Sequence, residues 1–204
     1  MFQRKRVATF FLLCLVIYGL LMAPWPGVRE AYAVCFQAAG SLLFGSFGTQ
    51  NGVRFRPAPN NPAGWDTEVV MKNPASGATG TVLHCSRKMG YVPTVVLVSL
   101  VLATPLPWSR KGRALLWGLL VINAFVALRI ALVLLRDLSQ DDPLCLFELG
   151  PFMHRVLAWA IRALVMSPGS YYGFPVVLWI LVTLRRRDWH TIFAASQDPD
   201  KRQT

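Results

Sequence analysis

The stretch "ALLWGLLVINAFVALRIALVLL", residues Ala114–Leu135, carries the strongest indication of the fold class. It is apolar along its length except for Asn123 and Arg129, and it contains no proline. An α-helix rises about 1.5 Å per residue, so roughly 20 apolar residues cross the hydrocarbon core of a bilayer. The basic cluster Arg110–Arg113 comes directly before the stretch. We therefore predict a transmembrane helix here.

The composition of the whole chain points to the same class. Of its 204 residues, 54% are hydrophobic and 15% are charged, and the mean hydropathy is +0.42. The formal net charge is +11, but the cations stand in short clusters between apolar runs, which does not suit a nucleic acid-binding face. We expect an integral membrane protein that contacts membrane lipids and has no nucleic acid partner.

Three further apolar runs are predicted to cross the membrane, at about residues 7–24, 91–107 and 154–184. The first lacks a small-residue cleavage pattern and is interpreted as a retained span. The last is broken at Ser167–Pro175, which indicates a kinked helix. The predicted fold class is an all-α polytopic membrane protein with about four transmembrane helices. They form one integral membrane domain, residues 1–195, and residues 196–204 are predicted to be a disordered cytoplasmic tail.

The basic clusters orient these predicted spans, because basic loops stay in the cytoplasm. Four crossings bring three clusters to one side, namely Arg4–Arg6, Arg110–Arg113 and Arg185–Arg187. The protein is therefore predicted to be a multi-pass protein of the cytoplasmic (inner) membrane with both termini in the cytoplasm. The insert at residues 25–89 and the acidic loop Arg136–Gly150 are then extracytoplasmic. This topology requires Ala31–Gly48 to lie along the membrane as an interfacial helix.

The extracytoplasmic insert contains a predicted β-hairpin. Within Asn51–Cys85, the runs "TEVVM" and "TGTVLHC" flank the turn-rich "KNPASGA". Short runs rich in Val and Thr that surround Pro, Asn and Gly are typical of two strands and their turn. The second run ends at Cys85, shortly before the apolar run at residues 91–107. The insert is therefore expected to bring a thiol to the membrane edge.

Three residues with complementary chemistry are predicted at one depth on the outer side. Cys85 precedes one span, Arg129 lies near the outer end of another, and His154 begins the last apolar region. A thiolate can attack a carbonyl group to form a thioester, an imidazole can carry the proton, and a guanidinium can stabilise the oxyanion. We therefore predict Cys85 as nucleophile, Arg129 as oxyanion stabiliser and His154 as general acid and base.

Each of these residues also has an ordinary structural interpretation. Arg129 could extend to the lipid headgroups, and His154 could be an inert interfacial residue. His84 adjoins Cys85, but neighbouring side chains of an extended segment point to opposite faces, which makes it a secondary candidate. Arg162 follows His154 by about two helical turns. It is the other secondary candidate, for a substrate or oxyanion contact.

The stretch "HCSRKMGYVPTVVLVSLVLATPLPWSRKGRALLWGLLVINAFVALRI", residues His84–Ile130, resembles the core of the exosortase/archaeosortase family of membrane cysteine transpeptidases. In that family a cysteine opens one membrane helix, and an arginine lies in the next. His154 fits the position of the family's histidine, and the chain is most similar to compact bacterial forms such as exosortase H. The resemblance implies an enzyme that cleaves C-terminal sorting tails from exported proteins and passes the new C-terminus to an envelope acceptor.

The remaining sequence features leave two other classes open. The chain has no C-x-x-C pair, no Cys/His metal spacing and no glycine-rich phosphate loop, so we expect neither a metal nor another cofactor. Cys35 and Cys145 are both predicted outside, where they could form a disulfide. One alternative is a quinone-linked four-helix thiol oxidoreductase, suggested by four cysteines and four predicted spans. The other is a non-catalytic membrane scaffold subunit.

Overall fold

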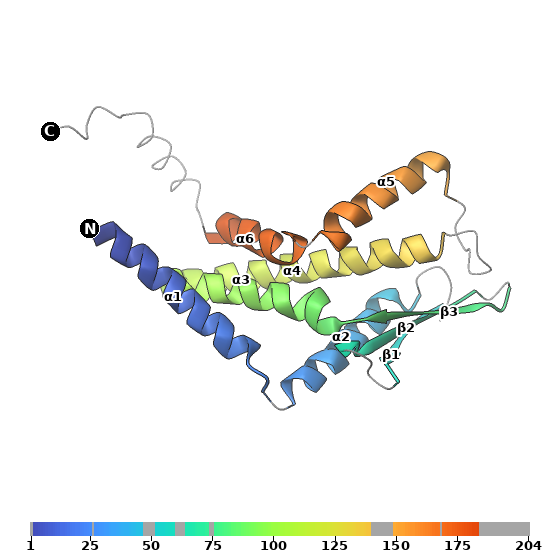
Figure 1. The fold of residues 1–204 in the computed structure, drawn as a ribbon, viewed down its shortest axis with the longest axis horizontal. Helices are drawn as coiled ribbons and strands as arrows, with labels where there is room; N and C mark the ends of the chain where they lie inside the picture. The colour runs from blue at the N-terminus through green and yellow to red at the C-terminus, as the bar shows by residue number, and fades with distance from the viewer. Residues whose placement is uncertain are drawn as a thin grey trace.

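The computed structural model describes residues 2–25, 27–46, 52–59, 64–73, 76–139, 149–167 and 169–183 (Figure 1). The α-helices are α1 (Phe2–Met22), α2 (Val28–Phe44), α3 (Val92–Ala103), α4 (Trp108–Asp137), α5 (Pro151–Ile161) and α6 (Gly169–Thr183). Two π-helical segments are η2 (Arg87–Tyr91), which leads into α3, and η3 (Arg162–Met166), which continues α5. The strands are β1 (Val53–Pro57), β2 (Thr67–Lys72) and β3 (Thr79–His84). The predicted tail, residues 196–204, and Cys145 lie outside the described residues.

The strands form an antiparallel sheet in the order β1-β2-β3. The predicted hairpin around "KNPASGA" is present as β2 and β3, with Lys72 opposite Thr79. The strand β1 was not predicted, and it pairs Phe55 with Val69. Because side chains alternate along a strand, apolar residues gather on one face of the sheet. Arg54, Arg56, Glu68 and Lys72 lie on the other face, where Arg56 Nε is 2.7 Å from Glu68 Oε2.

The apolar face of the sheet packs against α2 and the C-terminal half of α4. Their shared buried cluster consists of Phe44, Val53, Phe55, Val69, Met71, Val126, Ile130, Leu134 and Leu138. Gly40 of α2 lies so close to β1 that a Cβ atom there would be 2.7 Å from the ring of Phe55. This glycine therefore allows the helix to approach the strand. The burial of these side chains fixes the sheet to one side of α4.

The N-terminal half of α4 belongs to a second buried cluster, formed with α3 and α6. It contains Leu97, Val101, Ala114, Ile122 and Leu178. Farther along α4, Phe125 stacks on Phe174 of α6 with ring centroids 3.8 Å apart. In Figure 1, α4 runs through the middle of the molecule, and α5 and the sheet lie on opposite sides of its C-terminal half. The helix α4 thus connects the two cores.

The predicted fold class of an all-α protein with about four transmembrane helices is wrong. Among the described residues, α4 is the one helix long and apolar enough to cross a membrane by itself. Pro151–Met166 and Gly169–Thr183 meet that criterion only as a pair, and they are bent by 79°. The apolar part of α1, Val7–Met22, is shorter than a span. The three-stranded sheet is also more extensive than the predicted hairpin.

The physical reason for the error is that hydropathy counts apolar residues but not unbroken helix length. The predicted span at residues 91–107 contains α3, which has 12 residues and is about 18 Å long at 1.5 Å per residue. A bilayer core is about 30 Å thick. The helix ends at Ala103, and Pro105 and Pro107 follow it. Of the predicted multi-pass topology, the structure supports one helix that is long and apolar enough to cross a membrane by itself.

Candidate functional site

Cys85 occupies the junction between the end of β3 and the start of η2. Its side chain is half-buried, and its carbonyl oxygen accepts a hydrogen bond of 3.0 Å from the N–H of Met89. The cysteine therefore stands at the N-terminal end of the continuous helical segment formed by η2 and α3. The predicted position of the thiol, after a strand and before an apolar helix, is the position that the structure has.

Asp66, which precedes β2, holds the residue after the cysteine. Its carboxylate accepts hydrogen bonds from the Ser86 N–H at 2.9 Å and from the Ser86 hydroxyl at 2.8 Å. The Thr67 hydroxyl donates to the same carboxylate at 3.1 Å. An acidic side chain at a helix N-terminus satisfies N–H groups that have no partner within the helix. Asp66 thereby fixes the junction at Cys85 to the beginning of β2.

His84 is buried on the helix-facing side of the sheet. It stands opposite Thr67, so it shares a sheet face with Val69 and Val82. The side chain is 4% exposed, and its Nε2 has no hydrogen-bond partner among the described residues. Burial lowers the pKa of His84 to about 4. At neutral pH this imidazole is therefore uncharged and a weak base.

Arg129 is enclosed by α4, η3 and α6. The side chain is 1% exposed, and Nη2 donates a hydrogen bond of 3.2 Å to the carbonyl of Val165. Its Cζ lies 4.3 Å from the ring centroid of Tyr171 and 5.8 Å from that of Phe125. Nε and Nη1 have no partner among the described residues. This burial argues against the interpretation that Arg129 extends to the lipid headgroups. Within the described part of the chain, Nε and Nη1 are donors without an acceptor.

The segment that follows Cys85 packs on the part of α4 that carries Arg129. Met89 of η2 contacts the buried cluster that includes Val126 and Ile130, which flank the arginine. A Cβ atom at Gly90 would be 3.7 Å from Val126. These contacts bring η2 and the arginine-bearing turn of α4 into one neighbourhood.

His154 lies elsewhere, on the exposed surface of α5. It lines a hollow of about 520 Å³ together with Arg136, Arg155 and Arg162. Neither Cys85 nor Arg129 lines this hollow. Across the part of the chain that the structure describes, no hydrogen bond or ion pair joins any two of the three predicted catalytic side chains. The secondary candidate Arg162 thus lines the same hollow as His154, whereas Cys85 does not.

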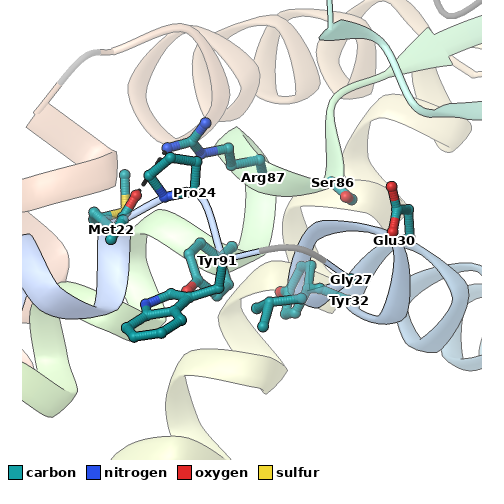
Figure 2. A pocket seen from close by; sticks show the side chains of 11 residues that line it. Met22, Pro24, Gly27, Glu30, Tyr32, Ser86, Arg87 and Tyr91 are labelled. Carbon is teal, nitrogen blue, oxygen red and sulfur yellow. Dashed lines mark hydrogen bonds between the residues drawn. The ribbon is translucent and has the colours of Figure 1, made fainter.

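A pocket of about 210 Å³ lies beside the thiol junction (Figure 2), between the end of α1, the start of α2 and η2. We call it the junction pocket; it is lined by Met22, Ala23, Pro24, Trp25, Gly27, Val28, Glu30, Tyr32, Ser86, Arg87 and Tyr91. Figure 2 shows the Arg87 guanidinium over this pocket, bonded to Met22, with Glu30 of α2 at its far side. Ser86, the residue after the cysteine, therefore contributes to the pocket wall.

Side chains around the junction pocket satisfy the last carbonyl groups of α1. Arg87 Nη2 donates to the Met22 carbonyl at 3.4 Å, and the Tyr91 hydroxyl donates to the Leu21 carbonyl. Carbonyls at a helix C-terminus need such partners because the helix supplies none. Tyr32 packs edge-on against Tyr91, with centroids 5.2 Å apart. Burial, and secondarily the charge of Asp66, raises the pKa of Tyr32, which keeps its phenol protonated.

Two residues that hold the candidate site in place were not predicted from the sequence. Asp66 is bonded to Ser86, and Tyr171 covers the guanidinium of Arg129. The pair Tyr171-Tyr172, within the predicted helix break at Ser167–Pro175, could have indicated an aromatic contact near the arginine. No local pattern connects Asp66 with Ser86.

The described residues contain no group of three or more His, Cys, Asp or Glu side chains that could hold a metal ion. The described cysteines, Cys14, Cys35 and Cys85, are free thiols. The predicted pairing of Cys35 with Cys145 involves a residue outside the described part. Comparisons with protein-family models, with curated proteins and with solved structures find no significant match for this chain.

Proposed function

We propose that this protein is a membrane-embedded cysteine transpeptidase that cleaves C-terminal sorting tails of exported proteins. It works at the outer side of the cytoplasmic membrane and passes the new C-terminus to an envelope acceptor. The observation that carries the proposal is the burial of Arg129 with two guanidinium nitrogens that have no hydrogen-bond partner among the described residues. A buried cation without full compensation costs several kcal/mol, and each unsatisfied buried donor requires an explanation, of which a catalytic role is one.

The reaction would proceed through a thioester. His154 takes the thiol proton of Cys85, the resulting thiolate attacks the carbonyl carbon of the scissile amide, and the oxyanion that forms accepts hydrogen bonds from Arg129. The C–N bond then breaks, and the leaving amine takes a proton from the imidazolium of His154. In the second half, His154 takes a proton from an amine or hydroxyl of the acceptor as this group attacks the thioester. The C–S bond breaks, and the Cys85 thiolate is released.

The junction pocket supports a peptide substrate. Its volume of about 210 Å³ suits one side chain of an extended peptide better than a separate small molecule, since ligand pockets measure about 300–1,000 Å³. Ser86 lines it, so a side chain bound there would lie near the carbonyl that Cys85 attacks. We assign this pocket to the substrate residue next to the scissile bond.

The surface of the molecule supports an environment of lipid. Large apolar side chains are exposed on α1, α2, α4, α5 and α6, including Leu15, Leu42, Leu116, Trp159 and Leu181. Exposed apolar surface of this extent is unusual on a soluble monomer. The same surface would accept the membrane helix of a sorting tail.

The assignment of the base to His154 requires α5 to bring this residue to the thiol when substrate is bound. His84 is closer along the chain, but its pKa of about 4 makes it a poor proton acceptor at neutral pH. His154 is exposed and free to exchange protons with water. The proposal therefore includes a movement of α5, which is joined to α6 through a bend of 79°.

The first test is a cleavage assay in membranes with an exported protein that carries a motif, a membrane helix and a basic end. Cys85→Ala is expected to lower cleavage by about 10³-fold or more, as removal of a nucleophile does. Cys35→Ala, on an exposed thiol of α2, is the matched control and should cleave like the wild type. Retained cleavage by Cys85→Ala would overturn the proposal. Loss of activity in Cys145→Ser instead would favour the thiol oxidoreductase.

A second test addresses the other two residues. Arg129→Gln is expected to lower cleavage about 10²–10³-fold, the loss seen when an oxyanion donor is removed, whereas Arg113→Gln at the other end of α4 should have little effect. For the base, His154→Cys is combined with serine at Cys14, Cys35 and Cys145. Oxidation in the presence of substrate should link residue 154 to Cys85, which requires Cα atoms about 4.4–6.8 Å apart. Failure of this crosslink would remove His154 from the mechanism.

A further inference from the structure

The hollow lined by His154 has a chemistry that the transpeptidase reaction does not use. Arg136, Arg155 and Arg162 contribute three guanidinium groups to its wall, and Trp159 and Met166 contribute apolar surface. Among the described residues, no Asp or Glu side chain lines it. We call this site the cationic hollow. Its charge favours an anion, and its volume of about 520 Å³ is within the range of ligand sites.

The arginines of the cationic hollow have no ion-pair partner among the described residues. The ion pair that the described part contains is the one between Arg56 and Glu68, in the sheet. Asp137 follows Arg136 along the chain but does not line the hollow. Arg155 and Arg162 are exposed, so their guanidinium groups can reach a ligand. Planar guanidinium groups bind phosphate through paired hydrogen bonds, which makes arginine a preferred residue for phosphate recognition.

The cationic hollow also lies where a bilayer places phosphates. Arg136 is in the last turn of α4, the helix that can cross a membrane. With 30 residues, α4 is about 45 Å long and can extend from one headgroup layer to the other, a distance of about 40–45 Å. Its C-terminal end, and the hollow with it, would then lie at headgroup depth.

The helix α5 has the surface of an interfacial helix beside this hollow. Phe152 and Trp159 are 75% and 76% exposed, and Met153 and Val156 are exposed as well. Aromatic residues, tryptophan above all, concentrate at membrane interfaces, and helices with an apolar face and basic residues lie in the interface plane. The apolar residues of α5 suit the acyl boundary, and Arg155 of α5 and Arg162 at the start of η3 suit the phosphates.

We propose that the cationic hollow binds the phosphate group of an anionic phospholipid and thereby holds α5 at the membrane surface. The inference rests on α4 lying across a bilayer, as the proposed function has it, but not on any role of Cys85. The bound group is a phosphodiester. Free phosphate is also an anion whose phosphoryl oxygens bind guanidinium groups, so the experiment must separate the two sources.

The test uses the full chain reconstituted in nanodiscs of phosphatidylcholine with or without phosphatidylglycerol, and measures binding of a fluorescent phosphatidylglycerol. The double variant Arg155→Gln/Arg162→Gln is expected to weaken binding at least about tenfold, since each charge-assisted hydrogen bond contributes strongly. The matched control, Arg110→Gln/Arg113→Gln, removes two exposed arginines from the opposite end of α4 and should bind like the wild type. Equal weakening in both double variants would overturn the proposal, because it would indicate general charge attraction.

Two further arms complete the test. Inorganic phosphate at millimolar concentration should not displace the lipid; displacement would assign the hollow to free phosphate and overturn the lipid proposal. Cys85→Ala should keep wild-type lipid binding while losing cleavage, so failure of the enzyme proposal and failure of the lipid proposal give different results. Loss of lipid binding in Cys85→Ala would also overturn the inference, because it would place the lipid at the thiol.

Discussion

The two sides of α4 differ in how firmly they hold their candidate residues. On one side, the sheet, α2 and η2 share a buried cluster with α4, and Asp66 accepts two hydrogen bonds from Ser86, the residue after Cys85. On the other side, α5 carries His154 on an exposed surface and continues through η3 to a sharp bend. The proposed nucleophile therefore lies beside a packed core, whereas the proposed base lies on the exposed surface of a helix. An enzyme with this construction would complete its site only when substrate or membrane draws α5 into place.

The largest expected effect compares two methionines, one on each side. Met71 in β2 is 1% exposed, and Met153 in α5 is 55% exposed. Met71→Ala should lower the free energy of unfolding by about 2–5 kcal/mol, because it removes buried apolar atoms and leaves a cavity. Met153→Ala should change it by about 0.5 kcal/mol or less. Denaturant unfolding in detergent measures both, and equal effects would contradict the contrast between the two sides.

The next effect compares two histidines through the pH dependence of stability. The pKa of His84 is about 4 in the folded protein and about 6.5 in an unfolded chain. Between these values the unfolded chain binds more protons, so stability falls as pH decreases from about 6.5 to 4. The loss from this residue is about 3 kcal/mol.

His84→Gln should remove that part of the pH dependence, whereas His154→Gln, on an exposed residue, should leave it in place. Unfolding curves at several pH values for the wild type and both variants provide the measurement. An unchanged slope in His84→Gln would mean that this imidazole is not the buried neutral group described above.

The smallest of the three effects probes the close packing of η2. A Cβ atom at Gly90 would be 2.2 Å from the hydroxyl of Tyr32, so Gly90→Ala should cost about 1–3 kcal/mol through overpacking. Tyr32→Phe removes the obstructing oxygen and should recover most of the loss in the double variant. Gly112→Ala, with no atom within 4 Å, is the control. Thermal unfolding of the four variants decides the point, and a lack of recovery would locate the strain elsewhere.

Local features of the fold were predictable from the residues, because local chemistry determines them. Ala114–Leu135 lies within α4, and the turn-rich "KNPASGA" connects β2 to β3. The length of α3 was not predictable from hydropathy, since apolar residues continue past the point where prolines end the helix. The strand β1, Val53–Pro57, alternates two arginines with apolar residues as a half-buried strand does, but it was missed because a Pro- and Asn-rich stretch follows it. Its pairing with β2 depends on the tertiary structure and not on the local sequence.

The candidate site was predictable in its residue types but not in its contacts. The position of Cys85 between a strand and a helix follows from the sequence, and so does the presence of an arginine within an apolar helix. The cation–π contact of Arg129 with Tyr171 and the hydrogen bonds between Asp66 and Ser86 join residues far apart in the chain. Such contacts depend on how α6 and the sheet pack on α4. Charge and hydropathy alone also placed His154 at the depth of Cys85, without regard to the side of α4 on which it lies.

The π-helical segment η2 makes the direction of the thiol depend on residue count. A π-helical turn contains one residue more than the α-helical turn it replaces, and each residue of an α-helix turns the chain by about 100°. Deleting one residue from Arg87–Tyr91 would therefore regularise the helix and rotate Cys85 by about that angle relative to α3. Such a deletion could leave Cys85, Arg129 and His154 in the sequence while the sulfur of Cys85 pointed in a different direction. In this segment, chain length is as much a determinant of the site as residue identity.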